Sequence, residues 1–175
     1  DYFVRRGLQE SDDIDYLFVI NNLNLNSAYY KKKLIEEPFY NYEQTLDKFK
    51  NLTVINRANV GHDFGAYSFA TFFQGDEGKY LRDNYKYFIF LNSTALGPFL
   101  PLYFDKDKHW SSAFIELLND KVKLVGPTIN VHGWKKAHVQ SYFLATDRVG
   151  LNVGISEGIF TQTPKKIIKK DVIEE

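Results

Sequence analysis

The sequence predicts an α/β fold, with a Rossmann-like, mostly parallel sheet flanked by helices. Apolar runs of strand length alternate with helix-like stretches along the chain, and these runs are almost continuously apolar. The 175 residues, 44% of them hydrophobic, are enough for one domain with a substantial core and too few for two ordinary ones. We therefore expect residues 1–175 to form a single domain.

Four apolar runs are predicted to be strands, and each ends in polar or turn-forming residues. They cover residues 14–20, 52–55, 87–91 and 122–125. The runs lack the alternation of a strand with one wet face, and such continuity is typical of strands covered on both faces. This pattern favours a buried, parallel sheet.

The predicted helices fall between these strands. Residues 28–37 and 42–50 both lie between the first two strands, and residues 65–74 and 110–119 lie in the two later intervals. The resulting order of strand and helix is typical of right-handed crossovers between parallel strands. Residues 138–146 predict a fifth strand, a short helix follows from Asp147, and residues 165–175 form a solvated helix or a frayed end.

Composition excludes several classes of function. The 22 basic and 22 acidic residues give zero formal charge, which argues against a nucleic-acid partner or an anionic lipid surface. No run approaches the roughly 18 apolar residues of a membrane span. The chain has no cysteine, which excludes thiolate chemistry and favours a reducing, cytoplasmic location. It also has no methionine, even at position 1, so we expect it to be a fragment of a longer protein.

Asparagine side chains follow three of the predicted strands. Asn21 and Asn22 end the first, Asn56 follows the second, and Asn92 follows the third. Ligands of open parallel sheets bind beyond the carboxyl ends of the strands. Side-chain amides there suit hydroxyls, a ribose or the edge of a nucleobase, although asparagine also favours turns and caps for local reasons.

Residues 59–67 form the most informative block. Gly61 and Gly65 permit a tight turn and a close backbone approach, and Asp63 can either cap the following helix or bind a ligand. His62 is a candidate contact for a diphosphate. The glycine spacings of phosphate-binding and dinucleotide-binding loops are both absent, which removes support for ATPase or NAD-dependent activity.

Two later blocks complete the candidate site. Asn92 and Ser93 open a polar turn, and Gly97-Pro98 begins a rigid loop suited to the floor of a sugar pocket. His138 and Gln140 are candidates to face an acceptor, because alternate residues of a strand share one face.

These blocks together resemble a known family. The runs Asn-Val-Gly-His-Asp, Phe-Leu-Asn-Ser with Gly-Pro-Phe-Leu-Pro, Gly-Pro-Thr-Ile and His-Val-Gln-Ser are similar to the rhamnan synthesis protein F family and to related viral and eukaryotic glycosyltransferases of polysaccharide synthesis. The resemblance covers roughly residues 14–155. It implies a GT-A-type fold that binds a nucleotide-diphosphate sugar and transfers the sugar to a glycan or another hydroxyl acceptor. The family motifs fall on Asn59, Gly61, Asp63, Asn92, Ser93, Gly97, Pro98, His138 and Gln140.

One feature of such enzymes is missing. Many GT-A enzymes hold Mn²⁺ or Mg²⁺ with an Asp-x-Asp sequence after the central strand, whereas this chain has Asn92-Ser93-Thr94 there. No cofactor is therefore certain. Asp105 and Asp107 have the right spacing and lie in a loop, which makes them weak candidates for a metal.

Glycosyl transfer requires a neutralised leaving diphosphate and a deprotonated acceptor hydroxyl. The base is Asp63, His138 or Asp147, and the sequence does not choose between them. Candidates for neutralising the diphosphate are Arg57, His62, Lys135, Lys136 and the helix N-terminus at Gly65. Two alternatives stay open. One is a non-catalytic domain that binds a nucleotide sugar or a glycan, and the other is an interaction module without nucleotide affinity.

Overall fold

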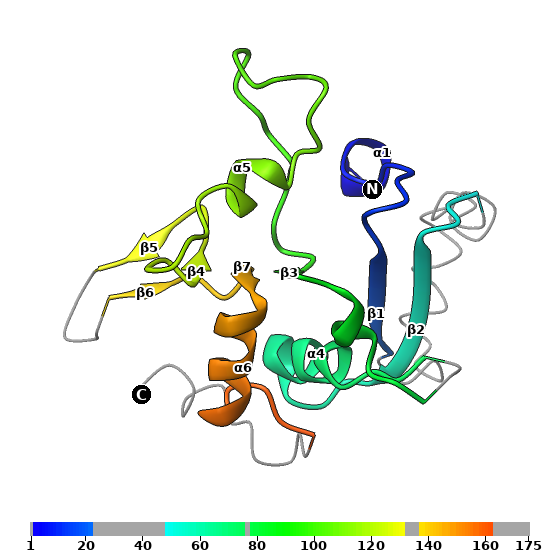
Figure 1. Ribbon diagram of the computed structural model, residues 1–175. Coiled ribbons are helices and arrows are strands. Elements are labelled where there is room, and N and C mark those ends of the chain that lie inside the picture. The colour runs from blue at the N-terminus through cyan, green and yellow to red at the C-terminus, as the bar shows by residue number, and fades with distance from the viewer. Residues whose placement is uncertain (1, 23–47, 76–77, 132–136, 163–175) are drawn as a thin grey trace. The chain divides into compact units, whose positions relative to one another are not determined.

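The computed structural model describes residues 2–22, 48–75, 78–131 and 137–162 (Figure 1). The chain divides into two compact units. The smaller unit is Leu8–Val60, and the larger unit combines Asp1–Gly7 with Gly61–Glu175.

The smaller unit contains a parallel pair of strands. Strand β1 (Tyr16–Asn22) pairs in parallel with β2 (Leu52–Ala58). The side-chain amide of Asn51 donates hydrogen bonds to the carbonyls of Gln9 (3.0 Å) and Ile14 (2.8 Å), which ties the start of β2 to the segment before β1. The first two predicted strands are thus present. The helix predicted over residues 28–37 and most of that over 42–50 lie outside the described residues.

The larger unit holds the other elements. It begins with α1 (Tyr2–Arg6) and resumes with α4 (His62–Thr71), η1 (Leu81–Asn84), β3 (Tyr87–Leu91), α5 (Ser112–Ile115), β4 (Leu124–Val125), β5 (Ile129–Asn130), β6 (His138–Val139), β7 (Phe143–Asp147) and α6 (Arg148–Ser156). The predicted strand 87–91 and the helix after Asp147 are confirmed. The helix predicted over 110–119 is reduced to the single turn of α5.

The prediction of a GT-A-type, mostly parallel Rossmann-like sheet is wrong. The main sheet has the order β3-β7-β4, and β7 runs antiparallel to both neighbours. A further antiparallel pair joins β5 and β6, so β1–β2 is the one parallel pair in the part of the chain that the structure describes. Continuous apolar character reports that a strand is covered on both faces, and it carries no information about strand direction.

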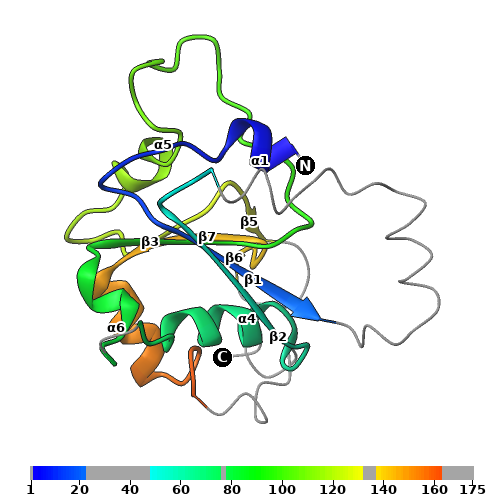
Figure 2. The same ribbon diagram turned by 90° about the vertical axis from the view of Figure 1, so that its right-hand side faces the viewer.

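Strand β7 lies at the centre of the sheet and is its most buried strand. Phe143 and Ala145 face a cluster with Trp110 and Val125, whereas Leu144 points to the opposite face. That second cluster contains Phe64, Tyr67, Phe90, Leu144, Leu151 and Phe160. Helices α4 and α6 cover this face and α5 lies on the other side of the sheet (Figure 2). The expectation of strands covered on both faces therefore holds for β3 and β7, whereas Leu124 of β4 and four of the seven residues of β2 are exposed.

The strand predicted over residues 138–146 is divided in two. Its first part, β6, pairs with β5, while β7 pairs with β3 and β4. One straight strand cannot serve both sheets, so the chain turns at residues 140–142. The turn is closed by a hydrogen bond from the backbone N–H of Phe143 to the carbonyl of Gln140 (3.4 Å). The expected sharing of one strand face by His138 and Gln140 is therefore wrong.

Candidate functional site

Three of the sequence blocks meet at one end of β3 in the larger unit. Because β3 and β7 are antiparallel, the residue after β3 lies beside the residue before β7. The backbone N–H of Asn92 accordingly donates to the carbonyl of Tyr142 (3.0 Å). The antiparallel arrangement thus places the Asn92 turn next to the segment that follows His138.

A hydrogen bond joins this edge to the start of α4. The side-chain oxygen of Asn92 accepts from the backbone N–H (3.0 Å) and the hydroxyl (2.5 Å) of Thr94. These contacts fix the orientation of the amide, so its nitrogen faces Asp63 and donates to Oδ2 at 3.0 Å. Asp63 and Asn92 are half-buried, whereas Thr94 is exposed. The structure therefore brings together a carboxylate, an amide and a hydroxyl.

Helix α4 begins earlier than predicted, and in an unusual way. Gly61 at the N-cap has φ 78°, and His62, the first helical residue, also has a positive φ of 51°. Gly61 supplies no side-chain cap. Asp63 is therefore a first-turn residue and not the cap, and its negative charge lies where the positive end of the helix dipole stabilises it.

Tyr67 links α4 to the segment before β7, and the sequence did not single it out. Its hydroxyl donates to the carbonyl of Ser141 at 2.9 Å, and the residue is only 5% exposed. Burial, and after it the negative charge of Asp63, raises the pKa of Tyr67 far above its ordinary value, so the phenol stays a donor. The available signal was its position four residues after Asp63, on the same helix face.

The other predicted residues of the larger unit lie in the turn and loop after β3 and in or just after β6. Ser93 is exposed in the turn after β3, and Gly97-Pro98 is a cis peptide in the following loop. Gln140 donates its backbone N–H to the carbonyl of Thr128 (3.2 Å). His138 pairs with Asn130 in the β5–β6 hairpin. Lys135 and Lys136 lie outside the described residues.

Four candidates belong to the smaller unit, which is described separately. Asn21 and Asn22 end β1, Arg57 is in β2, and Asn59 follows that strand as an exposed residue. The guanidinium of Arg57 donates to the carbonyl of Val60. Burial lowers the pKa of Arg57 from its ordinary value.

Asp147, the third candidate base, has a structural role. Its Oδ1 caps α6 by accepting from the backbone N–H of Gly150 (2.8 Å), and its Oδ2 accepts from Nζ of Lys123 (2.7 Å). Burial raises the pKa of Asp147, but the hydrogen bonds from Lys123 and Gly150 outweigh burial, so the pKa lies below its ordinary value. A carboxylate held in this way is poorly suited to accept a proton.

The weak metal candidates form a local turn. The backbone N–H of Asp107 donates to Oδ1 of Asp105 at 3.0 Å, and both residues are exposed. Among the described residues, no three acidic, histidine or cysteine side chains gather in a way that would hold a metal ion. The acidic pair therefore has an ordinary explanation as an Asx-turn.

Comparisons with protein-family models, with curated proteins and with solved structures gave no match to this chain. Within residues 2–22, 48–75, 78–131 and 137–162, no helix has the length and apolar character needed to cross a membrane.

Proposed function

We propose that this chain binds a nucleotide-diphosphate sugar and transfers the glycosyl group to a hydroxyl of a glycan or similar acceptor. The observation that carries the proposal is the hydrogen bond between Asn92 and Asp63. It joins two of the sequence blocks that resemble glycosyltransferases. The hydrogen bond from the backbone N–H of Asn92 to the carbonyl of Tyr142 adds the residue that directly follows a third such block, His138–Ser141. The cysteine-free sequence favours a cytoplasmic setting for this activity.

In the proposed reaction Asp63 acts as general base. The acceptor oxygen forms a bond to the anomeric carbon while the bond from that carbon to the diphosphate oxygen breaks. The hydroxyl proton passes to the Asp63 carboxylate, and the electron pair of the broken bond leaves with the nucleoside diphosphate. The hydrogen bond from Asn92 orients the carboxylate, and the N-terminus of α4 with His62 offers positive potential for the leaving group.

A second candidate function is non-catalytic binding of a nucleotide sugar or a glycan. The observation that favours it is the engagement of two carboxylates in contacts within the protein. Asp147 caps a helix and pairs with Lys123, and Asp63 accepts from Asn92. In this alternative Asp63 and Asn92 recognise sugar hydroxyls without chemical turnover.

Titration calorimetry separates binding from its absence. The full chain is titrated with UDP-, GDP- and dTDP-sugars, with and without Mn²⁺. We expect one nucleotide series to bind. If none binds under either condition, both sugar-nucleotide functions are wrong and an interaction module becomes the better explanation.

A pair of isosteric variants then separates the enzyme from the binding domain. Asp63→Asn keeps an oxygen that can accept from Asn92 but cannot take up the proton, so we expect transfer to fall about 100-fold or more with donor affinity retained. Asp105→Asn is the matched control, because asparagine also supports an Asx-turn, and it should leave transfer unchanged. Donor binding without turnover in the unaltered chain would favour the non-catalytic function.

A further inference from the structure

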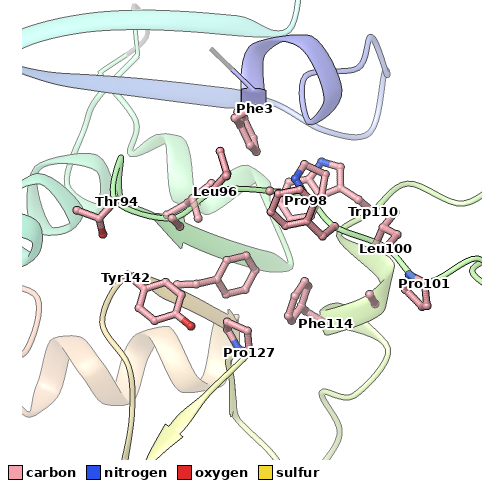
Figure 3. A pocket seen from close by; sticks show the side chains of 16 residues that line it. Phe3, Thr94, Leu96, Pro98, Leu100, Pro101, Trp110, Phe114, Pro127 and Tyr142 are labelled. Atoms are coloured by element: carbon pink, nitrogen blue, oxygen red, sulfur yellow. The ribbon is translucent and has the colours of Figure 1, made fainter.

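An apolar cavity of about 590 Å³ lies in the larger unit, beside the candidate site (Figure 3). Half of its lining comes from the loop of residues 94–101. The other lining residues are Phe3, Leu91, Trp110, Ala113, Phe114, Pro127, Tyr142 and Phe143. No charged side chain is among its sixteen lining residues. Its volume falls within the range of about 300–1,000 Å³ that is usual for small-molecule sites.

Aromatic side chains form much of the cavity wall, and contacts with one another and with the backbone hold several of them. The indole nitrogen of Trp110 donates to the carbonyl of Gly7 at 2.8 Å. Phe3 meets Trp110 edge-on with ring centroids 5.8 Å apart, and Phe114 lies 4.3 Å from Phe143. The wall is therefore largely fixed before a ligand arrives, which reduces the entropy lost on binding.

Two polar lining residues, Thr94 and Tyr142, connect the cavity to Asn92 of the candidate site. The hydroxyl of Thr94 donates to the same Asn92 amide that contacts Asp63. Tyr142 contributes its ring to the cavity and its backbone carbonyl to Asn92, and its hydroxyl pairs with that of Thr128 (2.9 Å). A ligand that fills the cavity can therefore place a polar group beside Thr94, which contacts the Asn92 amide.

We propose that the cavity binds an aryl aglycone, so that the acceptor of this chain is a hydroxyl compound with an aromatic group attached. This inference rests on the proposed function, because it assigns the acceptor class for the same site. The uncharged wall disfavours phosphate or carboxylate groups, which lose their hydration there without gaining a partner. Flat aromatic rings gain both apolar burial and ring-to-ring contact from such a wall.

The binding test uses Trp110 as reporter. The chain has two tryptophans, Trp110 and Trp134, so Trp134→Phe leaves the one that lines the cavity. Phenyl β-D-glucopyranoside and methyl β-D-glucopyranoside are titrated separately, without a nucleotide sugar, and Trp110 emission is followed. We expect the phenyl glycoside to bind about 10-fold more tightly than the methyl glycoside, given the apolar area that a ring buries.

Two leucines of the same loop provide a matched pair of variants. Leu96 is 68% exposed and lines the cavity, whereas Leu102 is fully exposed and does not. Since both are at the surface, Leu96→Ser and Leu102→Ser should fold alike. Leu96→Ser should abolish most of the preference for the phenyl glycoside, and Leu102→Ser should keep it.

The inference is overturned if neither glycoside binds, if the two bind equally, or if the two leucine variants behave alike. A dimer in sedimentation that depends on Leu96, together with no glycoside preference, also overturns it and assigns the cavity to a second copy of the chain. Failure of the proposed function gives a different pattern. The phenyl glycoside then still binds, while calorimetry finds no nucleotide sugar that does.

Discussion

The two longest helices of the larger unit begin in opposite ways. Helix α6 starts at a side-chain cap, Asp147, which is paired with Lys123, and its first turn packs tightly through Gly150. Helix α4 starts at Gly61 without a side-chain cap, and its first residue, His62, has a left-handed backbone. Both helices carry an aspartate at or near the N-terminus, and only α6 uses it as the cap.

This difference separates a stabilising carboxylate from a candidate reactive one. The Asp147 carboxylate contacts a backbone N–H and a lysine within the protein, and these contacts explain its position completely. The Asp63 carboxylate accepts a hydrogen bond from the neutral amide of Asn92, in a junction that also contains Thr94. Residue type and closeness to a helix N-terminus therefore do not identify a site, whereas the chemistry of the partners does.

The largest effect on stability is expected from Gly150→Ala. A Cβ atom there would lie 2.2 Å from Oγ1 of Thr146 and 2.5 Å from the carbonyl of Lys123. This overlap outweighs the better helix propensity of alanine, so the free energy of unfolding should fall by about 2 kcal/mol. Urea denaturation measures it. Gly75→Ala is the control, because nothing lies within 4 Å of its Cβ position, and an equal loss in both variants would contradict the packing argument.

A smaller effect is expected from Asp147→Ala, which removes the cap of α6 and the partner of Lys123. We expect a loss of about 1–2 kcal/mol at pH 7, discounted because Lys123 can still reach water. Asp63→Ala should lose less, about 1 kcal/mol, because Asp63 is not the cap of α4 and its hydrogen-bond donor Asn92 is neutral. Equal losses in the two variants would make Asp63 a structural residue like Asp147.

The contribution of Asp147 to the free energy of unfolding depends on pH. The folded pKa of Asp147 is below its ordinary value of 3.8, so the unfolded chain binds the proton more readily. Its contribution to stability is therefore complete above pH 3.8 and is lost as the pH falls through the folded pKa. Denaturation across this range should show the unaltered chain converging on Asp147→Ala, and a constant difference between them would contradict the assignment.

The smallest effect is expected from His62→Gly, at the first residue of α4. His62 is exposed and has a φ of 51°, which glycine adopts at less cost, so His62→Gly should stabilise the chain by about 0.5 kcal/mol. Gly61→Ala, at φ 78°, should destabilise it by about 1 kcal/mol. Thermal unfolding measures both changes. Effects of the same sign would mean that the left-handed turn is not what distinguishes this helix start.

Local patterns predicted several elements well. The apolar run over 87–91 is β3 as expected, and the helix after Asp147 has its cap at the predicted residue. Asn92 was singled out as a polar residue at a strand end, and Asp63 as a residue of a glycine-flanked turn. These features depend on neighbouring residues, whose side chains and backbone preferences are written directly in the sequence.

Strand order and direction could not be predicted in this way. Residues 138–146 appeared to be one strand, but they supply β6 to one sheet and β7 to another. Tyr67 was missed because its partner, the carbonyl of Ser141, is 74 residues away in the chain. A pairing of this kind depends on which distant segments compete for the same buried position.

By itself, then, the sequence determined where β1, β2, β3 and α6 form, and which polar residues follow the strands. Only the tertiary structure decided that β7 lies between β3 and β4, and that Asn92 therefore meets the residues before β7 as well as Asp63. The reason is physical. Periodicity records how much of a segment is buried, whereas the choice of neighbour follows from the packing of the whole core, where Phe143, Leu144 and Ala145 fit best at the centre.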